Sequence, residues 1–300
     1  MSADRGAAAA VSVICVNFNG GALLVDCVRA VLASKLSVQV IVADNGSDDG
    51  SVAALRAALG SDARLAVVEH GANLGFARAN NAVLPRATGE FLLFLNPDCL
   101  VAPETLGQVR EAMGQWPHAG MAGCLIRNPD GSEQHGCRRR TPTPFPAFGR
   151  AFGLDRLFRG RGGYAAVDMS GEPLPAAPVE VEAISGAFMF VRRSALEAVG
   201  PLDEGYFLHC EDLDWCLRFR RAGFGVLFVP GAVVTHFQGS ASAGRPLRVE
   251  WHKHRGMLRY FRKFFLRDYP LPLAWLVAVG VWLRFAGVAA RVLFKRLVRP

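Results

Sequence analysis

The sequence lacks the features that mark a secreted, disulfide-stabilised protein. Its seven cysteines are an odd number and include no CxxC pair, and most lie in apolar runs, where cysteine behaves as a small hydrophobic residue. The first ten residues carry Asp4 and Arg5 before a short alanine run and do not have the layout of a signal peptide. These absences argue against a disulfide framework and favour a reducing cytoplasm for the catalytic part.

Charged residues are also sparse, at 20% of the 300 residues, whereas 51% are apolar, so the chain can bury a large core without a structural metal. The net charge of +8 is uneven: residues 245–300 hold thirteen Lys and Arg against two acidic residues, a net +11, which leaves −3 for residues 1–244. We therefore divide the chain into a catalytic domain at 1–244 and a basic, apolar helical tail at 245–300. Such a tail suits an anionic membrane surface better than nucleic acid.

Short apolar segments alternate with helical patterns in the first hundred residues. Strands are predicted at 11–16, 38–43, 65–69 and 91–95, with helices at 22–34, 52–59 and 76–84. This alternation indicates an α/β fold with a Rossmann-like, mostly parallel sheet, which binds ligands at the carboxyl ends of its strands. The GxG-type dinucleotide fingerprint is absent after the first strand, and no internal repeat is present. The stretch 138–178, rich in Pro, Gly and Arg, is predicted to be a long loop or a lid over the acceptor.

Two aspartates follow predicted strands. Asp98, in Leu95-Asn96-Pro97-Asp98, is placed to hold a hard cation against phosphate oxygens, and a turn or helix-capping aspartate is an equal alternative from this segment by itself. Asp44 can accept a hydrogen bond from a nucleotide base or ribose, or form the turn of Asp44-Asn45-Gly46.

An arginine lies near the start of the third predicted helix, after Asn73 and Gly75. A helix N-terminus with a nearby guanidinium such as that of Arg78 suits a diphosphate, and a surface arginine is the alternative.

Glu211, Asp212 and Asp214 place three carboxylates within four residues, and such crowding raises at least one pKa, as a general base requires. Asp214 and Arg218 are four residues apart on a predicted helix and form a structural pair, which leaves Glu211 or Asp212 to face the cleft. Ordinary negative charge at a helix N-terminus is the alternative. His236, after a predicted strand, can ligate a metal, although a single histidine is more often a packing or surface residue.

In order and spacing, these segments together resemble the family 2 glycosyltransferases of GT-A fold, and especially the bacterial rhamnosyltransferase branch, over residues 11–265. The resemblance rests on residues 13–19, 42–51, 73–81, 95–98 and 211–218 and on His236. It implies inverting transfer from a nucleotide-diphosphate sugar to a hydroxyl group, with a Mg²⁺ or Mn²⁺ ion on the diphosphate. The nucleotide-sugar half is expected at about 11–125 and the acceptor half at about 126–244.

The resemblance also implies roles for single residues. Donor contacts are implied for Asn17, Asn19, Asp44, Asn73, Arg78, Asn96 and Gly186. Asp98 matches the metal-binding aspartate of the family's DxD motif, whose first aspartate is replaced here by Asn96, and His236 matches a histidine that some members use as a further ligand. Asp212 matches the catalytic base, with Glu211 beside it.

The tail is apolar without interruption over residues 271–283, which is short of the roughly twenty residues that a spanning helix needs. Arg284, Arg291 and Lys295 follow on one helical face, so we predict an interfacial anchor at the cytoplasmic face of the inner (plasma) membrane. A tilted spanning segment, a helix packed on the catalytic domain and the interface of a homo-oligomer are the alternatives.

The function expected from these features is transfer of rhamnose from dTDP-rhamnose to a cell-envelope glycan or a lipid-linked acceptor. Alternative donors carry galactofuranose, glucose or N-acetylglucosamine. A nucleotidyltransferase is a further alternative, but it would need a basic, Gly-rich loop after the first strand, and residues 17–21 contain no basic residue. A non-catalytic membrane adaptor is the third, suggested by Asn96 in place of an aspartate.

Overall fold

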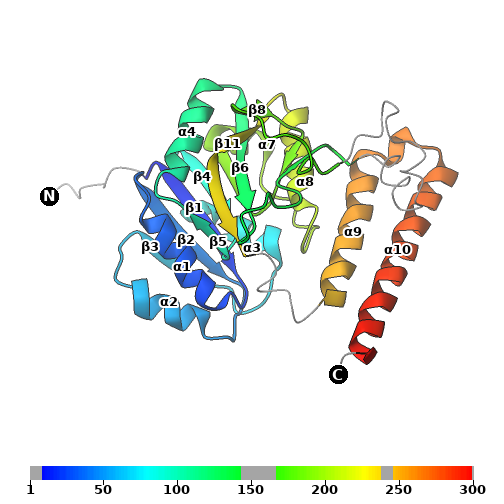
Figure 1. Ribbon diagram of the computed structural model, residues 1–300, viewed down its shortest axis with the longest axis horizontal. Coiled ribbons are helices and arrows are strands. Elements are labelled where there is room, and N and C mark those ends of the chain that lie inside the picture. The colour runs from blue at the N-terminus through cyan, green and yellow to red at the C-terminus, as the bar shows by residue number, and fades with distance from the viewer. Residues whose placement is uncertain (1–8, 143–166, 238–245, 299–300) are drawn as a thin grey trace.

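The computed structural model describes residues 9–142, 167–237 and 246–298, with side chains up to residue 294. Helices flank a central twisted sheet, and a hairpin of two long helices stands beside this layered domain (Figure 1). The predicted α/β architecture is confirmed. The predicted boundary at 244–245 and most of the predicted loop at 138–178 lie outside the described residues.

The bounds of the strands and helices show how closely the sequence pattern predicted them. The strands are β1 Val11–Asn17, β2 Val38–Asp44, β3 Leu65–Glu69, β4 Phe91–Leu95, β5 Cys99–Val101, β6 Ala119–Arg127, β7 Arg138–Arg139, β8 Val179–Glu180, β9 Ala183–Ile184, β10 Phe188–Arg192 and β11 Gly225–His236. The helices are α1 Gly21–Leu32, α2 Ser51–Leu59, α3 Phe76–Val83, α4 Thr105–Gln115, α7 Arg193–Val199, α8 Glu211–Arg221, α9 Pro246–Phe264 and α10 Leu271–Val298, with short 3₁₀ turns η1 Leu84–Arg86 and η2 Leu266–Asp268. The four predicted strands and three predicted helices of the first hundred residues are confirmed.

The sheet order places one ligand-binding edge in the middle of the molecule. The nine strands run β3-β2-β1-β4-β10-β6-β11-β5, with β8 paired to β11, and β7 and β9 form a separate two-stranded sheet. β1 pairs in parallel with β2 and β4, so Asn17, Asp44 and Leu95 lie near the same edge. β10 is antiparallel to both neighbours because it starts at this edge, where Phe188 pairs with Leu95.

The core is built from strands that are buried on both faces, as continuous apolar runs predict. Phe94 on β4 meets Trp215 on α8 edge to face, with ring centroids 4.9 Å apart, so the helix that starts with Glu211 is anchored against the centre of the sheet. All seven cysteines are free and buried, which confirms that they act as apolar packing residues.

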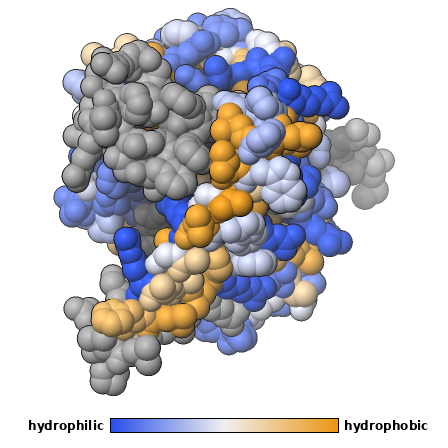
Figure 2. Space-filling model, turned by 90° about the vertical axis from the view of Figure 1, so that its right-hand side faces the viewer, coloured by the Kyte–Doolittle hydropathy of each residue, from blue (hydrophilic) through white to orange (hydrophobic). Residues whose placement is uncertain are grey.

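The C-terminal hairpin exposes much of its apolar surface. α10 packs on α9 through Trp251 and Trp282, whose ring centroids lie 4.9 Å apart. Leu271, Trp275, Leu276, Val279, Leu283, Leu293 and Phe294 are exposed along α10 and contribute to the apolar band in Figure 2.

The helix of the tail continues beyond the apolar run at 271–283. Arg284 does not end the helix: its guanidinium lies 3.9 Å from Met257 Sδ on α9, and α10 continues beyond it. By length and composition, the 24 residues from Leu271 to Phe294 could cross a membrane.

Candidate active site

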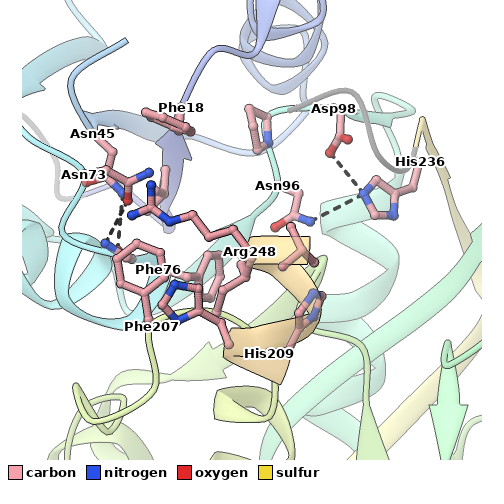
Figure 3. Close-up of a pocket in the computed structure, with 16 residues that line it drawn as sticks. Phe18, Asn45, Asn73, Phe76, Asn96, Asp98, Phe207, His209, His236 and Arg248 are labelled. Atoms are coloured by element: carbon pink, nitrogen blue, oxygen red, sulfur yellow. Dashed lines mark hydrogen bonds and ion pairs between the residues drawn. The ribbon is translucent and has the colours of Figure 1, made fainter. Parts of the chain in front are cut away.

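A cavity of about 280 Å³ opens at the carboxyl edge of β1, β2 and β4. Its wall is formed by the loops after these strands and after β3, by residues 207–209 before α8, by the end of β11 and by the first turns of α9. Figure 3 shows that its polar side chains gather at two ends, one around Asn45 and Asn73 and the other around Asn96, Asp98 and His236.

The second of these ends, the acidic corner, comprises Asn96, Asp98 and His236. Asn96 and Asp98 follow β4, and antiparallel pairing of β5 with β11 brings His236 opposite Cys99. His236 Nε2 lies 3.0 Å from Asp98 Oδ1 and 3.4 Å from Asn96 Nδ2. The structure therefore brings together three residues that the sequence placed in one site.

The histidine of the acidic corner is oriented by a residue that the sequence analysis missed. His236 Nδ1 lies 2.7 Å from the buried amide oxygen of Gln134, an acceptor that favours a proton on this nitrogen and so leaves Nε2 as the ring atom able to ligate a cation beside Asp98. Asp98 Oδ1 and His236 Nε2 lie 3.0 Å apart, close enough for one divalent cation to bind both atoms, so the corner fits such an ion.

Cys99 also lies near this corner, since it can offer a ligand atom within 4.8 Å of those of Asp98 and His236. Burial raises the pKa of its thiol well above the ordinary value. The sulfur also lies 3.6 Å from the carbonyl oxygen of Ala187, to which it can donate. Cys99 therefore stays a neutral thiol, and the oxygen and imidazole ligands are the better ones for a hard cation.

The other end of the cavity carries two asparagines. Asn45 donates from Nδ2 to the carbonyl oxygen of Gly75 at 3.3 Å, whereas its buried Oδ1 has no hydrogen-bond partner among the described residues. Asn73 accepts from the Gly75 N–H at 3.0 Å. An unpaired buried amide oxygen in a cavity wall is suited to an N–H of a nucleotide base. The strand-end pattern predicted Asp44 for this contact and did not single out its neighbour Asn45.

Asp44 has a different place. Its carboxylate accepts from the N–H groups of Gly46 and Ser47 at 3.1 and 3.0 Å, from Ser47 Oγ at 2.6 Å and from Asn17 Nδ2 at 2.9 Å. This is the turn that the sequence analysis gave as the alternative. Asn19 exchanges side-chain and backbone hydrogen bonds with Asp48.

Three of the predicted donor contacts, Asn17, Asn19 and Asp44, therefore do not line the cavity. They hold together the two loops that carry Phe18 and Asn45. Arg78 is exposed on α3 and also lies outside the cavity wall. Of the predicted donor residues, Asn73 and Asn96 line it.

The predicted base lies beside the cavity, at the start of α8, three residues after its wall residue His209. Asp212 forms an ion pair with Arg139 at 2.5 Å and accepts from the Gly186 N–H at 3.0 Å. A side chain at Gly186 would meet Asp212, since an added Cβ would lie 3.3 Å from the aspartate's Cβ. The absence of a side chain at Gly186 thus allows the backbone to approach Asp212 closely.

The pKa values of the two candidate carboxylates, Glu211 and Asp212, are shifted in opposite directions. Burial raises the pKa of Glu211 to about 8, with a contribution from the charge of Asp212. Burial also acts to raise the pKa of Asp212, but the Arg139 guanidinium and the N–H groups of Leu213 and Gly186 outweigh it, so the pKa falls below its ordinary value. At neutral pH Asp212 is the ionised member of the pair and Glu211 the protonated one, which leaves Asp212 as the base candidate.

Asp214 is structural, as predicted. It is fully buried and pairs with Arg218 at 2.7 Å. Its other oxygen accepts from Tyr206 Oη at 3.1 Å and from Lys263 on α9 at 2.7 Å.

Residues 12–200 match the family described as glycosyl transferase family 2. The chain belongs to this family. It is 29% identical over 264 residues to the N-acetylglucosaminyl-diphospho-decaprenol L-rhamnosyltransferase of Mycobacterium tuberculosis, which covers 84% of each chain. It is also 29% identical over 168 residues to the rhamnosyltransferase WbbL of Escherichia coli, covering 56% of this chain and 60% of that one. The chain is therefore a glycosyltransferase, as its motifs predicted.

The fold agrees with this assignment. The mannosyltransferase PcManGT of Pyrobaculum calidifontis, solved with GDP-Man and Mn²⁺, superposes with a TM-score of 0.60 at 19% identity and covers 96% of this chain and 77% of its own. The GT-A arrangement expected from the sequence is confirmed.

Replacing Glu211 with glutamine should change how the stability of this family 2 enzyme depends on pH. With a native pKa of about 8 against an ordinary 4.5, the folded protein keeps a proton that the unfolded chain releases. Wild-type stability therefore falls as pH rises between these values, by up to about 1.4 kcal/mol per pH unit. In urea unfolding at pH 5, 6.5 and 8, the free energy of unfolding of Glu211→Gln should increase relative to that of wild type as pH rises. Exposed Glu197→Gln serves as control, and a gain independent of pH contradicts the raised pKa.

Replacing Arg139 with glutamine should move the acid limb of the kcat profile to higher pH. Loss of the guanidinium raises the pKa of Asp212, so a larger share of the base is protonated near neutral pH. Activity should fall about tenfold or more at pH 6 and recover in part at pH 9, whereas Arg139→Lys keeps the limb near its wild-type position. Arg140→Gln, which removes a more exposed pair with Glu172, is the matched control. An unshifted limb in Arg139→Gln would remove Asp212 from the role of base.

Proposed function

We propose that this glycosyltransferase moves rhamnose from dTDP-rhamnose to a hydroxyl group of a glycan linked to a lipid diphosphate, at the cytoplasmic face of the membrane. The observation that carries the proposal is one cavity with an acidic corner at one end and the unpaired Asn45 oxygen at the other, and with the buried carboxylate of Asp212 beside it. The names of the Mycobacterium and Escherichia coli relatives support rhamnose as the sugar, and the decaprenol-linked name supports the acceptor class.

The donor diphosphate is proposed to lie at the acidic corner. Asp98 and His236 would hold a Mn²⁺ or Mg²⁺ ion there, and such an ion supplies charge neutralisation for the departing nucleoside diphosphate. Asn96 contributes no charge and directs its amide nitrogen toward the His236 ring at 3.4 Å. Gln134 keeps that ring in the tautomer that leaves Nε2 as the ligand atom.

Asp212 is proposed to take the proton of the acceptor hydroxyl as its oxygen attacks the anomeric carbon. The ion pair with Arg139 and the hydrogen bond from Gly186 hold this carboxylate ionised and fixed in direction. Attack from the side opposite the leaving group inverts the anomeric carbon, and the sugar–phosphate bond breaks with its electrons going to the diphosphate. Glu211, protonated beside it, avoids a second buried negative charge.

The membrane part of the proposal concerns the hairpin of α9 and α10. α10 exposes apolar side chains along much of its length, and α9 carries the exposed cations Arg255 and Arg262. Apolar area next to cations is the combination that binds anionic bilayers. A lipid-linked acceptor lies in such a bilayer, so this arrangement would bring the cavity to its substrate.

Asp98→Asn should lower the rate of rhamnose transfer by on the order of a hundredfold or more, because it removes the charged ligand while keeping the shape of the side chain. Transfer from dTDP-rhamnose to a polyprenyl-diphosphate N-acetylglucosamine acceptor would be followed with Mn²⁺, with Mg²⁺ and after EDTA. Exposed Asp26→Asn is the control and should keep wild-type rates. Donor binding that resists both EDTA and Asp98→Asn would refute the metal assignment, and faster transfer from UDP-galactofuranose, UDP-glucose or UDP-N-acetylglucosamine would refute the donor.

The full-length chain should sediment with vesicles that contain phosphatidylglycerol. Two charges in the apolar face, in the double variant Leu276→Glu and Val279→Glu, should weaken this binding more than tenfold, because carboxylates are costly to bury in a bilayer. Leu174→Glu, at an exposed apolar position outside the hairpin, is the matched control. Wild type that stays in the supernatant, or a double variant that binds as wild type does, would contradict the membrane proposal.

A further inference from the structure

The first turns of α9 form one wall of the donor cavity, contributed by Arg248, Val249 and His252. Phe207, from the segment before α8, orients two of these side chains. The His252 ring stacks on Phe207 with centroids 4.2 Å apart, and the Arg248 guanidinium carbon lies 5.5 Å from the centre of the same ring. An aromatic face therefore positions the arginine at the cavity wall, where its side chain remains exposed to solvent.

Arg248 stands out by its charge. Among the described residues that line the cavity, it is the only lysine or arginine, and within the described ranges its guanidinium has no carboxylate partner. His252 does not share this role, because burial, Arg248 and Arg255 lower the pKa of its imidazole. A fixed arginine without a carboxylate partner has its donors available to an anion.

The position of Arg248 identifies the anion. In Figure 3 its side chain extends across the space between the acidic corner at Asp98 and His236 and the end that carries Asn45 and Asn73, with the guanidinium nearer the asparagines. A nucleotide-sugar with its base at Asn45 and its metal at Asp98 must pass its two phosphates through this space. A planar guanidinium with five N–H donors matches phosphate oxygens in pairs.

We propose that Arg248 binds the diphosphate of the nucleotide-sugar donor, so that the C-terminal hairpin forms part of the donor site. This inference rests on the proposed function only in requiring a nucleoside diphosphate donor, and it holds for any sugar. It adds a residue of the C-terminal hairpin to the site, in a part of the chain that lies outside the residues matched to the family, 12–200.

The contacts that hold α9 in place give this assignment a structural basis. Gly256 lies so close to the turn before α8 that an added Cβ would be 2.8 Å from the carbonyl oxygen of His209. Two turns further on, Lys263 pairs with Asp203 and with buried Asp214, each at 2.7 Å. Arg248 is therefore carried into the cavity by a docked helix, the same helix on which α10 packs.

The test compares nucleotide affinity among full-length variants. UDP, GDP and dTDP are titrated calorimetrically in Mn²⁺, and the tightest of them is used with the matching nucleoside monophosphate. We expect Arg248→Gln to raise the Kd for the diphosphate about tenfold or more, Arg248→Lys to raise it less, and the Kd for the monophosphate to change by a much smaller factor. Arg255→Gln, an exposed arginine on the same helix outside the cavity wall, should stay within about twofold of wild type.

Each outcome decides the assignment. A wild-type Kd for the diphosphate in Arg248→Gln overturns it, as does an equal loss in Arg255→Gln, which would indicate general charge rather than a site. A variant with an unchanged donor Kd but a raised KM for the lipid-diphosphate acceptor assigns Arg248 to the acceptor and also overturns it. If transfer uses a donor other than dTDP-rhamnose while Arg248→Gln still loses diphosphate affinity, the donor proposal fails and this one stands.

Discussion

The pairing of β5 with β11 is the constraint on which the site depends. It brings His236 to the acidic corner beside Asn96, 140 residues away in the chain, and it does so through backbone hydrogen bonds rather than through the side chains that do the chemistry. The N–H of Phe237 donates to the carbonyl oxygen of Asp98 at 2.9 Å and closes the same junction. Because the backbone pairing fixes the two strand ends relative to each other, the ligand atoms of Asp98 and His236 are already preorganised before a cation binds.

The second constraint is the turn at His209 and Cys210, which leads into α8. Both residues have positive φ values, 68° and 72°, a conformation that non-glycine residues adopt only when their surroundings enforce it. The enforcing contacts come from α9, since Gly256 packs against this turn and Lys263 pairs with Asp214 one turn into α8. The position of the hairpin and the direction in which Asp212 points are thus coupled through a few buried contacts.

The sequence predicted the first half of the sheet because its signals there are local. Apolar runs of five to seven residues ending in polar turns are enough to define β1 to β4 and to place Asp98 at a strand end. The antiparallel strand β10 was not predicted as such, because its partners are distant in sequence. β11 was predicted only as a strand before His236, and its full length was not predicted because its run contains glycine and proline. The sequence indicated Glu211 and Asp212 as base candidates because their carboxylates lie close together in the chain. The lowered pKa of Asp212 depends on Arg139, and nothing in the run of three arginines at 138–140 distinguishes this one from its neighbours.

The same distinction explains why Asp44, predicted to contact the nucleotide, does not line the cavity whereas Asn45 does. Asp44 and Asn45 are adjacent and equally polar, and the strand pattern alone does not determine which of them faces the ligand. In the folded chain Asp44 satisfies four donors of its own loops, which leaves Asn45 with the unpaired oxygen. Both oxygens of an aspartate accept hydrogen bonds, and the backbone N–H groups of a tight turn can satisfy them. The side-chain amide of a neighbouring asparagine can keep its oxygen available to a partner outside the turn.

The charge of the cavity wall follows from these placements. Asp98 is the one carboxylate among the described residues that line it, and Arg248 is the one arginine, so the wall is close to neutral before any ligand binds. The aspartate expected at position 96 is an asparagine, which removes a negative charge from the corner. A divalent cation at Asp98 would then make the cavity positive overall, the sign that a diphosphate carrying two or more negative charges requires. With a second aspartate at position 96, the protein itself would neutralise most of the charge of the cation. Asn96 and Arg248 therefore both make the metal-bound cavity more positive, and this charge is neutralised by the donor diphosphate.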